Sequence, residues 1–266
     1  MLTIRLDTSK IKLSEKDKFF GIRLPTVLDS RLAYETGVSI GDGSLCIVRD
    51  RANLHYTINY SGNLQTELIY YEKVLKPLVE SLYGKTVKVE QRRKNECRIQ
   101  FTSKTIFLFK TEVLNLPVGK KYNITIPQII LQEKKLLLNC LRGIFDTDFS
   151  LVFLKKHKDV AYYPKLRLVS ISKPLIQQLE KIIKRKLNLN PVTEYGIRRF
   201  DPRTKKVYVS NALELNGKKS LEIWMEKVGS NNFINLAKFS LWKAFGYLPK
   251  TSLKEKINFL QHAPVA

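Results

Sequence analysis

The sequence predicts an α+β protein built from two pseudo-symmetric αββαββα units. Two observations carry this prediction: a short segment occurs twice, and the same order of helices and strands follows each copy. The first copy is Gly37-Val-Ser-Ile-Gly-Asp-Gly-Ser-Leu45, and the second is Gly143-Ile-Phe-Asp-Thr-Asp-Phe-Ser-Leu151. Repetition of a segment with matched flanks indicates a duplicated structural unit.

Each copy joins the end of a helix to the start of a strand. Helical character runs over 29–40 before the first copy and over 134–145 before the second. The residues that follow, 45–48 and 151–154, are apolar and typical of strands. Each unit therefore begins with what we call a motif helix, which ends close to an acidic residue.

Small residues lie four positions apart on each motif helix: Gly37 and Gly41 on the first, Gly143 and Thr147 on the second. Residues at i and i+4 share one helix face. A glycine inside a helix costs about 1 kcal/mol relative to alanine, so its presence needs a reason. Small residues on one face let two helix backbones approach closely. We therefore predict that the two units pack through their motif helices.

Asp42 and Asp148 occupy the same position in the two copies, at the C-terminal ends of the motif helices. The C-terminal end of a helix carries the negative pole of its dipole. Two carboxylates added there repel each other unless a cation lies between them. Carboxylate oxygens suit hard divalent ions such as Mg²⁺, so the pattern indicates a metal site.

The remainder of the first unit reads as two hairpins separated by a helix. Asp29 or Ser30 is the expected N-cap of the motif helix, and Ser103 or Thr105 that of the last helix. Pro77 predicts a kink or a split in the middle helix. Strands are expected over 45–49, 55–60, 86–90 and 97–102, and helices over 64–83 and 103–114.

The second unit repeats this order. Ser230 is the expected cap of its final helix. Strands are expected over 151–154, 166–171, 194–200, 206–210 and 221–228, and helices over 173–187 and 233–245. The predicted organisation is thus an N-terminal extension over 1–28, a first unit over 29–126 and a second unit over 127–266 that ends in a short basic tail.

The composition favours a polyanionic partner. The 266 residues carry a net charge of +23, spread over the chain, and nucleic acid is the first candidate for such a field. A membrane partner is not expected, because the chain contains no apolar run of about 18 residues. The N-terminus lacks the apolar region of a signal peptide, and the three cysteines are isolated. Both features favour a cytoplasmic location.

The two copies resemble the motif of the LAGLIDADG homing endonucleases, in the single-chain form with two motifs that archaeal-type intron-encoded enzymes have. The nine-residue motif corresponds to Glu35–Gly43 and Leu141–Phe149. Phe149 departs from the glycine that ends the family motif. The first acidic position of the motif is Asp146 in the second copy and Ile40 in the first, so it is the less expected metal ligand.

The resemblance implies a catalytic site at the ends of the motif helices. The last acidic residue of each motif binds metal in this family, which carries over to Asp42 and Asp148 with Mg²⁺ or Mn²⁺ as the ion. The backbone carbonyls of Gly41 and Thr147 are expected to complete the coordination. The family also places a basic residue near each scissile phosphate, and Lys227 is the best candidate for that role.

The resemblance also implies a saddle of two antiparallel sheets over the DNA major groove, a groove that admits a two-stranded ribbon. The family's closing segment, a strand leading through Gly-Ser-Asn into a helix, corresponds to Trp224–Leu236. The expected DNA-contacting residues are Arg49, Arg51, Tyr56, Arg92, Arg98 and Gln100 in the first unit and Lys156, Arg167, Arg198, Arg203 and Lys206 in the second.

The expected function is therefore that of a site-specific endonuclease that cuts both strands of duplex DNA in intron homing and acts as a monomer. Two alternatives stay open on the same fold. The first is an RNA maturase, whose partner would be intron RNA and which would not need the aspartates. The second is a DNA-binding regulator that does not cleave.

Overall fold

The computed structural model describes residues 4–51, 53–92, 95–202 and 205–262. The chain forms two compact units, one of Met1–Lys121 with Ile126–Thr147 and one of Tyr122–Thr125 with Asp148–Ala266. The bounds of these compact units differ from those of the units predicted above, 29–126 and 127–266. The second motif helix, α7 (Lys134–Asp148), belongs to the first compact unit except for its last residue.

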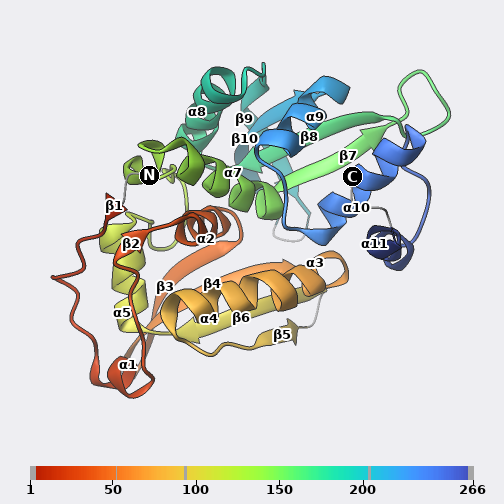
Figure 1. The fold of residues 1–266 in the computed structure, drawn as a ribbon. Helices are drawn as coiled ribbons and strands as arrows, with labels where there is room; N and C mark the ends of the chain where they lie inside the picture. Colours follow the sequence, from red (N-terminus) through yellow and green to blue (C-terminus); the bar gives the residue numbers. More distant parts are fainter. Residues whose placement is uncertain (1–3, 52, 93–94, 203–204, 263–266) are drawn as a thin grey trace. The chain divides into compact units, whose positions relative to one another are not determined.

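The first compact unit contains the predicted αββαββα order (Figure 1). Its strands form an antiparallel sheet in the order β3-β4-β6-β5. In the chain, the elements are α2 (Ser30–Ile40), β3 (Gly43–Asp50), β4 (Asn53–Asn63), α3 (Leu64–Tyr70), the π-helical segment η1 (Tyr71–Leu75), α4 (Lys76–Tyr83), β5 (Val89–Arg92), β6 (Glu96–Thr102), α5 (Lys104–Leu108) and the π-helical segment η2 (Phe109–Val113).

The ends of these helices follow the predicted capping. Asp29 accepts hydrogen bonds from the amides of Arg31 and Leu32 at the start of α2. Ser103 caps α5, and Gly84 ends α4 in the left-handed conformation. The interruption predicted from Pro77 is present as η1, where the amide of Lys76 bonds five residues back to Tyr71. Proline has no amide hydrogen to continue the α-helical ladder.

The segment before α2 is an ordered part of the first unit. It contains β1 (Ile4–Arg5), α1 (Glu15–Phe19) and β2 (Val27–Leu28), and β1 pairs with β2. Its anchor is the buried carboxylate of Asp17, whose Oδ2 accepts from the Thr105 amide at 3.0 Å and from Ser14 Oγ at 2.8 Å.

The second compact unit repeats the order after α7, as predicted, with an antiparallel sheet in the order β7-β8-β10-β9. A short helix, α6 (Gln128–Leu131), precedes α7. The further elements are β7 (Phe149–Leu154), β8 (Tyr163–Ser170), α8 (Lys173–Ile182), the π-helical segment η3 (Ile183–Leu187), β9 (Val192–Asp201), β10 (Lys206–Asn216), α9 (Lys218–Lys227), α10 (Phe233–Phe245) and α11 (Leu253–His262).

The closing segment differs from the prediction. The strand expected over 221–228 is wrong, because this stretch is helix α9. Leu221, Trp224 and Val228 are all buried, and their spacing of three and four residues puts them on one face of a helix. The residue that caps α10 is Asn232, which accepts from the Ile234 amide, and not Ser230. The segment therefore runs from helix to helix.

Among the described residues, no helix combines the length and the apolar composition that a membrane crossing requires.

Candidate catalytic site and nucleic-acid interface

The two motif helices contact each other at their glycines, within the first compact unit. An added Cβ at Gly37 would lie 3.0 Å from the Cα of Gly143 and would overlap the carbonyl oxygen of Cys140. An added Cβ at Gly143 would lie 2.7 Å from the amide nitrogen of Val38 and would overlap the carbonyl oxygen of Tyr34. The obstacles are backbone atoms, which no side-chain rotation can move aside. Only glycine fits at these two positions.

Asp42 lies between the end of α2 and the start of β3, and the surrounding structure holds both its backbone and its side chain. Its carbonyl oxygen accepts from the amide of Ser61 on β4 at 3.3 Å. Its Oδ2 accepts from the hydroxyl of Tyr71 at 2.8 Å. Burial and the Asp42 carboxylate raise the pKa of Tyr71 above its usual range. The hydroxyl therefore carries its proton and donates it toward Asp42.

Lys121 is the basic group at this end of α2, and it is not among the site residues predicted from the sequence. Its ammonium donates to the carbonyl oxygens of Ile40 at 2.8 Å and of Gly41 at 2.5 Å. A cation is favourable there because the last carbonyls of a helix carry partial negative charge. The Gly41 carbonyl, predicted to bind metal, thus accepts a hydrogen bond from an ammonium group in this structure. The pair Lys120-Lys121, in the loop before the second predicted unit, was the signal available in the sequence.

The second motif presents its two acidic residues differently. Asp148 is the last residue of α7, directly before β7. Asp146 is buried, and its Oδ2 accepts from the hydroxyl of Tyr34 at 2.6 Å. The Tyr34 hydroxyl also shares a 2.8 Å hydrogen bond with that of Tyr70. Asp146 therefore serves the interior of the first unit, and Thr147 uses its hydroxyl within α7, donating to the carbonyl of Gly143.

The carboxylates at this site fit a divalent metal ion whose coordination is completed by the substrate. Within the described parts of the chain, no group of three or more His, Cys, Asp or Glu side chains is placed to hold an ion. Mg²⁺ sites commonly use one or two carboxylates together with waters and substrate phosphates. The carboxylate of Asp42, which accepts a hydrogen bond from Tyr71, has the chemistry of such a ligand. Lys227, the predicted basic residue, is exposed at the end of α9.

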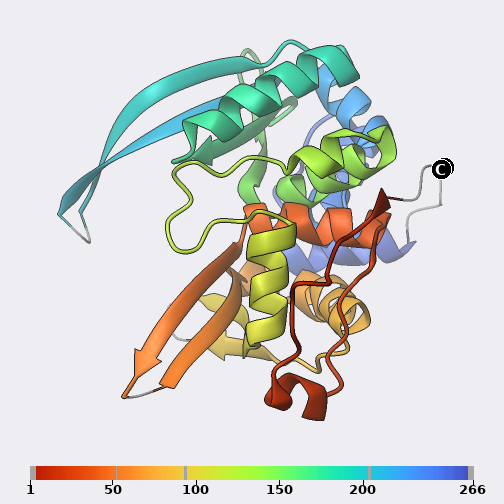
Figure 2. The ribbon, with the colours of Figure 1, turned by 90° about the vertical axis from the view of Figure 1, so that its left-hand side faces the viewer.

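The first sheet packs its helices against one face, and the opposite face is its outer face (Figure 2). On β6, Cys97, Ile99 and Phe101 are buried. Because successive residues of a strand point to opposite faces, Arg98 and Gln100 lie on the outer face. Both are predicted DNA contacts.

Arg92 also lies on the outer face, because it pairs with Glu96 on β6. Its guanidinium bonds to Glu90 at 2.6 Å, and Arg98 lies 3.6 Å from the same carboxylate. Arg49 and Tyr56 share the helix-covered side, and the Tyr56 ring packs edge-on against Phe107.

In the second sheet, as in the first, the predicted DNA contacts lie on both faces. Arg167 lies between the buried Leu166 and Leu168 and so points to the outer face, where its Nε forms an ion pair with Oε1 of Glu214 at 3.2 Å. Arg198 pairs with Val209 on the other face, at the end of the β9–β10 ribbon that extends beyond α8 (Figure 2).

The remaining predicted contacts lie at strand ends and turns. Lys206 is exposed at the start of β10. Arg51 and Lys156 lie in turns with positive φ angles, and the Lys156 ammonium lies 3.4 Å from the centre of the Tyr163 ring. Arg203 lies outside the described residues.

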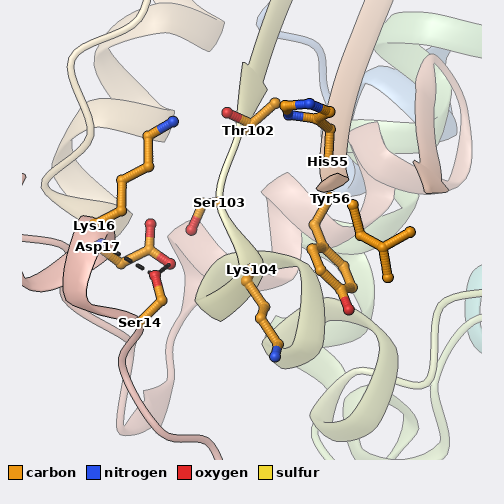
Figure 3. Close-up of a pocket in the computed structure, with 9 residues that line it drawn as sticks. Ser14, Lys16, Asp17, His55, Tyr56, Thr102, Ser103 and Lys104 are labelled. Carbon is orange, nitrogen blue, oxygen red and sulfur yellow. Dashed lines mark hydrogen bonds between the residues drawn. The ribbon is translucent and has the colours of Figure 1, made fainter. Parts of the chain in front are cut away.

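A pocket of about 190 Å³ lies where the N-terminal segment meets β4 and β6 (Figure 3). Lys16 lines it on the side of the N-terminal segment, and His55 and Thr102 line it on the side of the sheet. His55 and Thr102 belong to the outer face by their strand positions. The N-terminal segment thus adds a basic side chain at the edge of that face.

Comparison with known proteins identifies the fold. No family model matches the sequence, and no curated protein matches it. Among solved structures, the chain is similar to a variant of the homing endonuclease I-DmoI in complex with its nicked target DNA and manganese. The two sequences are 14% identical, the match covers 75% of this chain and 95% of that chain, and the TM-score is 0.52. A complex of I-DmoI with DNA and manganese shows 15% identity, covers 75% and 96% of the two chains, and has a TM-score of 0.50. The LAGLIDADG homing endonuclease I-GzeII bound to its DNA target shows 10% identity over 89% and 98%, with a TM-score of 0.49.

Proposed function

From the LAGLIDADG fold that this chain shares with I-DmoI, we propose that the protein is a site-specific endonuclease that hydrolyses both strands of duplex DNA. The observation that supports this function best is the carboxylate of Asp42, which is fixed by a hydrogen bond at the end of a motif helix. Solved structures of I-DmoI contain DNA and manganese. A carboxylate such as that of Asp42 is a suitable ligand for a divalent ion of this kind.

Asp42 and Asp148 would bind the divalent metal, Mg²⁺ or Mn²⁺, one aspartate from each motif. When bound, such an ion activates water for attack on the phosphodiester and stabilises the leaving oxygen. The aspartates act as ligands and not as nucleophiles. Lys121, whose ammonium lies at the end of α2, is a second proposed basic group near the scissile phosphate, in addition to Lys227.

The two sheets would supply recognition. Arginine and glutamine are the side chains that read guanine and adenine in the major groove, and Arg98, Gln100 and Arg167 present such groups on the outer faces. The remaining basic residues would neutralise phosphates without reading sequence. The net charge of +23 is sufficient for many such contacts.

The test is cleavage of a randomised duplex DNA library in the presence of Mg²⁺, followed by sequencing of the cut ends. We expect one family of related sequences, cut on both strands, and no cutting in the presence of EDTA. Asp42→Asn and Asp148→Asn should each abolish cleavage and leave binding of the selected duplex nearly unchanged. Cleavage at the wild-type rate by either variant would remove the metal assignment.

The same experiment separates the two alternatives. Selective binding of duplex DNA without cutting by the wild-type protein would identify a DNA-binding regulator. Selective binding of structured RNA, unaffected by the aspartate substitutions, would identify a maturase.

A further inference from the structure

Tyr71 lies in the interior of the first unit with 0% exposure, yet its hydroxyl reaches the carboxylate of Asp42 at 2.8 Å. We propose that Tyr71 is a positioning residue for the metal-binding carboxylate of Asp42. This inference rests on the proposed function, because it assigns a role in holding the metal ligand. It concerns a residue outside both copies of the repeated motif.

The local backbone aims Tyr71 at Asp42. Tyr71 is the first residue of the π-helical segment η1, and single π-helical turns within α-helices occur frequently at functional sites. Consecutive residues of a helix point in directions about 100° apart, so the two tyrosines serve two different partners. Tyr70 bonds to Tyr34, which bonds to Asp146, while Tyr71 bonds to Asp42.

Gly62 on β4 provides the room that the Tyr71 ring needs. An added Cβ at Gly62 would lie 2.6 Å from Cε2 and 2.9 Å from Cζ of Tyr71. Glycine weakens the interior of a strand, and it often marks a close approach by another group. Gly62 lies on the helix-covered side of the sheet, opposite Cys97. The absence of a side chain at Gly62 therefore leaves room for the Tyr71 ring in the position from which its hydroxyl donates to Asp42.

The hydrogen bond has a defined chemical consequence. Ligating carboxylates are themselves hydrogen-bonded in metal sites, and loss of such an outer partner lowers metal affinity or activity by about 10- to 100-fold. The Tyr71 hydroxyl fixes the rotation of the Asp42 carboxylate about its Cβ–Cγ bond. Metal binding then requires less ordering of the ligand.

The test compares Tyr71→Phe with Tyr83→Phe. The Tyr83 hydroxyl is also buried and also donates to a carboxylate, that of Glu35 at 3.0 Å, but Glu35 is not a proposed metal ligand. Bound Mn²⁺ is measured by electron paramagnetic resonance in the complex of each protein with the DNA duplex selected from the library. Thermal unfolding and metal-free DNA affinity are measured alongside.

We expect Tyr71→Phe to weaken Mn²⁺ binding by about 10-fold or more and to shift the Mn²⁺ dependence of cleavage by the same factor. Metal-free DNA affinity should change less than about twofold. Tyr83→Phe should lower the unfolding temperature by a similar amount and leave Mn²⁺ affinity unchanged. Gly62→Ala, which displaces the Tyr71 ring, should reproduce the metal defect of Tyr71→Phe.

Equal Mn²⁺ affinity in wild type and Tyr71→Phe would overturn the role of Tyr71 while the endonuclease assignment stands. A wild-type protein that neither binds Mn²⁺ in the complex nor cuts DNA would overturn the proposed function, and the role of Tyr71 with it.

Discussion

Glu35 and Lys110 form an ion pair in the interior of the first unit, with Nζ 2.5 Å from Oε1 and both side chains at 0% exposure. The hydroxyls of Tyr60 and Tyr83 also donate to Glu35. Glu35 opens the first motif, and the corresponding residue of the second motif is the buried Leu141. The same helix position can thus be filled by an apolar residue, and the buried ion pair belongs to the first motif and not to the second.

Removal of one partner of this pair should be strongly destabilising. We expect Lys110→Met to lower the free energy of unfolding by about 3–5 kcal/mol, because it leaves a buried carboxylate without its cation. The double variant Glu35→Leu, Lys110→Met should recover only part of that loss, because the buried hydroxyls of Tyr60 and Tyr83 then lose their acceptor. Urea unfolding measures both, with Lys184→Met as the control, since the exposed pair of Lys184 and Glu180 contributes only about 0–1 kcal/mol. A small effect of Lys110→Met, equal to that of the control, would contradict the buried pair.

The same carboxylate predicts an acid limit of stability. Burial alone would raise the pKa of Glu35, but the Lys110 ammonium and the hydrogen bonds to Glu35 lower it overall from its ordinary value of 4.5. The folded state therefore binds the proton of Glu35 less readily than the unfolded state does. The contribution is present above pH 4.5 and is lost as the pH falls through the folded pKa.

Unfolding free energies measured from pH 6 downward, about the range in which carboxylates titrate, should fall more steeply for wild type than for Glu35→Gln. Parallel curves would show that Glu35 does not hold a lowered pKa.

The helix contact at Gly37 should tolerate no side chain. Gly37→Ala places a Cβ against the carbonyl oxygen of Cys140, and overpacking of this kind costs about 1–3 kcal/mol. Gly37→Leu should cost more and should reduce cleavage, although we assign Gly37 no contact with metal or DNA. The control is Gln177→Leu on the exposed face of α8, which should change the unfolding temperature little. Wild-type stability in Gly37→Leu would contradict the close helix contact.

Lys121 and its neighbour Lys120 should behave differently. Lys121 bonds to the last carbonyls of α2, while Lys120 is exposed. We expect Lys121→Met to slow cleavage by about 100-fold, the scale of losing one charged group that stabilises the transition state. Lys120→Met should retain nearly the wild-type rate. Single-turnover cleavage at saturating protein separates this effect from DNA binding, and equal rates in both variants would remove Lys121 from the site.

DNA affinity should depend steeply on salt. Each phosphate contact releases counterions, so affinity should fall by about 1,000-fold or more between 50 and 200 mM salt if six or more contacts form. Lys16→Ala, at the edge of the outer face of the first sheet, should reduce the slope of log affinity against log salt by about one. Fluorescence anisotropy with the selected duplex measures both quantities. A flat dependence would argue against a nucleic-acid partner.

Local signals determined the order of elements. The repeated segment, the capping residues Asp29 and Ser103, and Gly84 at the end of α4 act within a few residues of themselves, so the chain shows them directly. The helix that forms where a strand was wrongly expected, over 221–228, was also predictable from local sequence, because Leu221, Trp224 and Val228 have helical spacing.

Only the tertiary structure decided which distant groups meet. The pairing of Glu35 with Lys110, the bond from Tyr71 to Asp42 and the approach of Lys121 to α2 each join side chains from separate elements. Such contacts depend on how helices pack against a sheet, and residue spacing along the chain carries no information about that packing. The repeated motif therefore identified Asp42 as a candidate ligand by itself, whereas the groups that surround and orient Asp42 emerged only when the first unit was assembled.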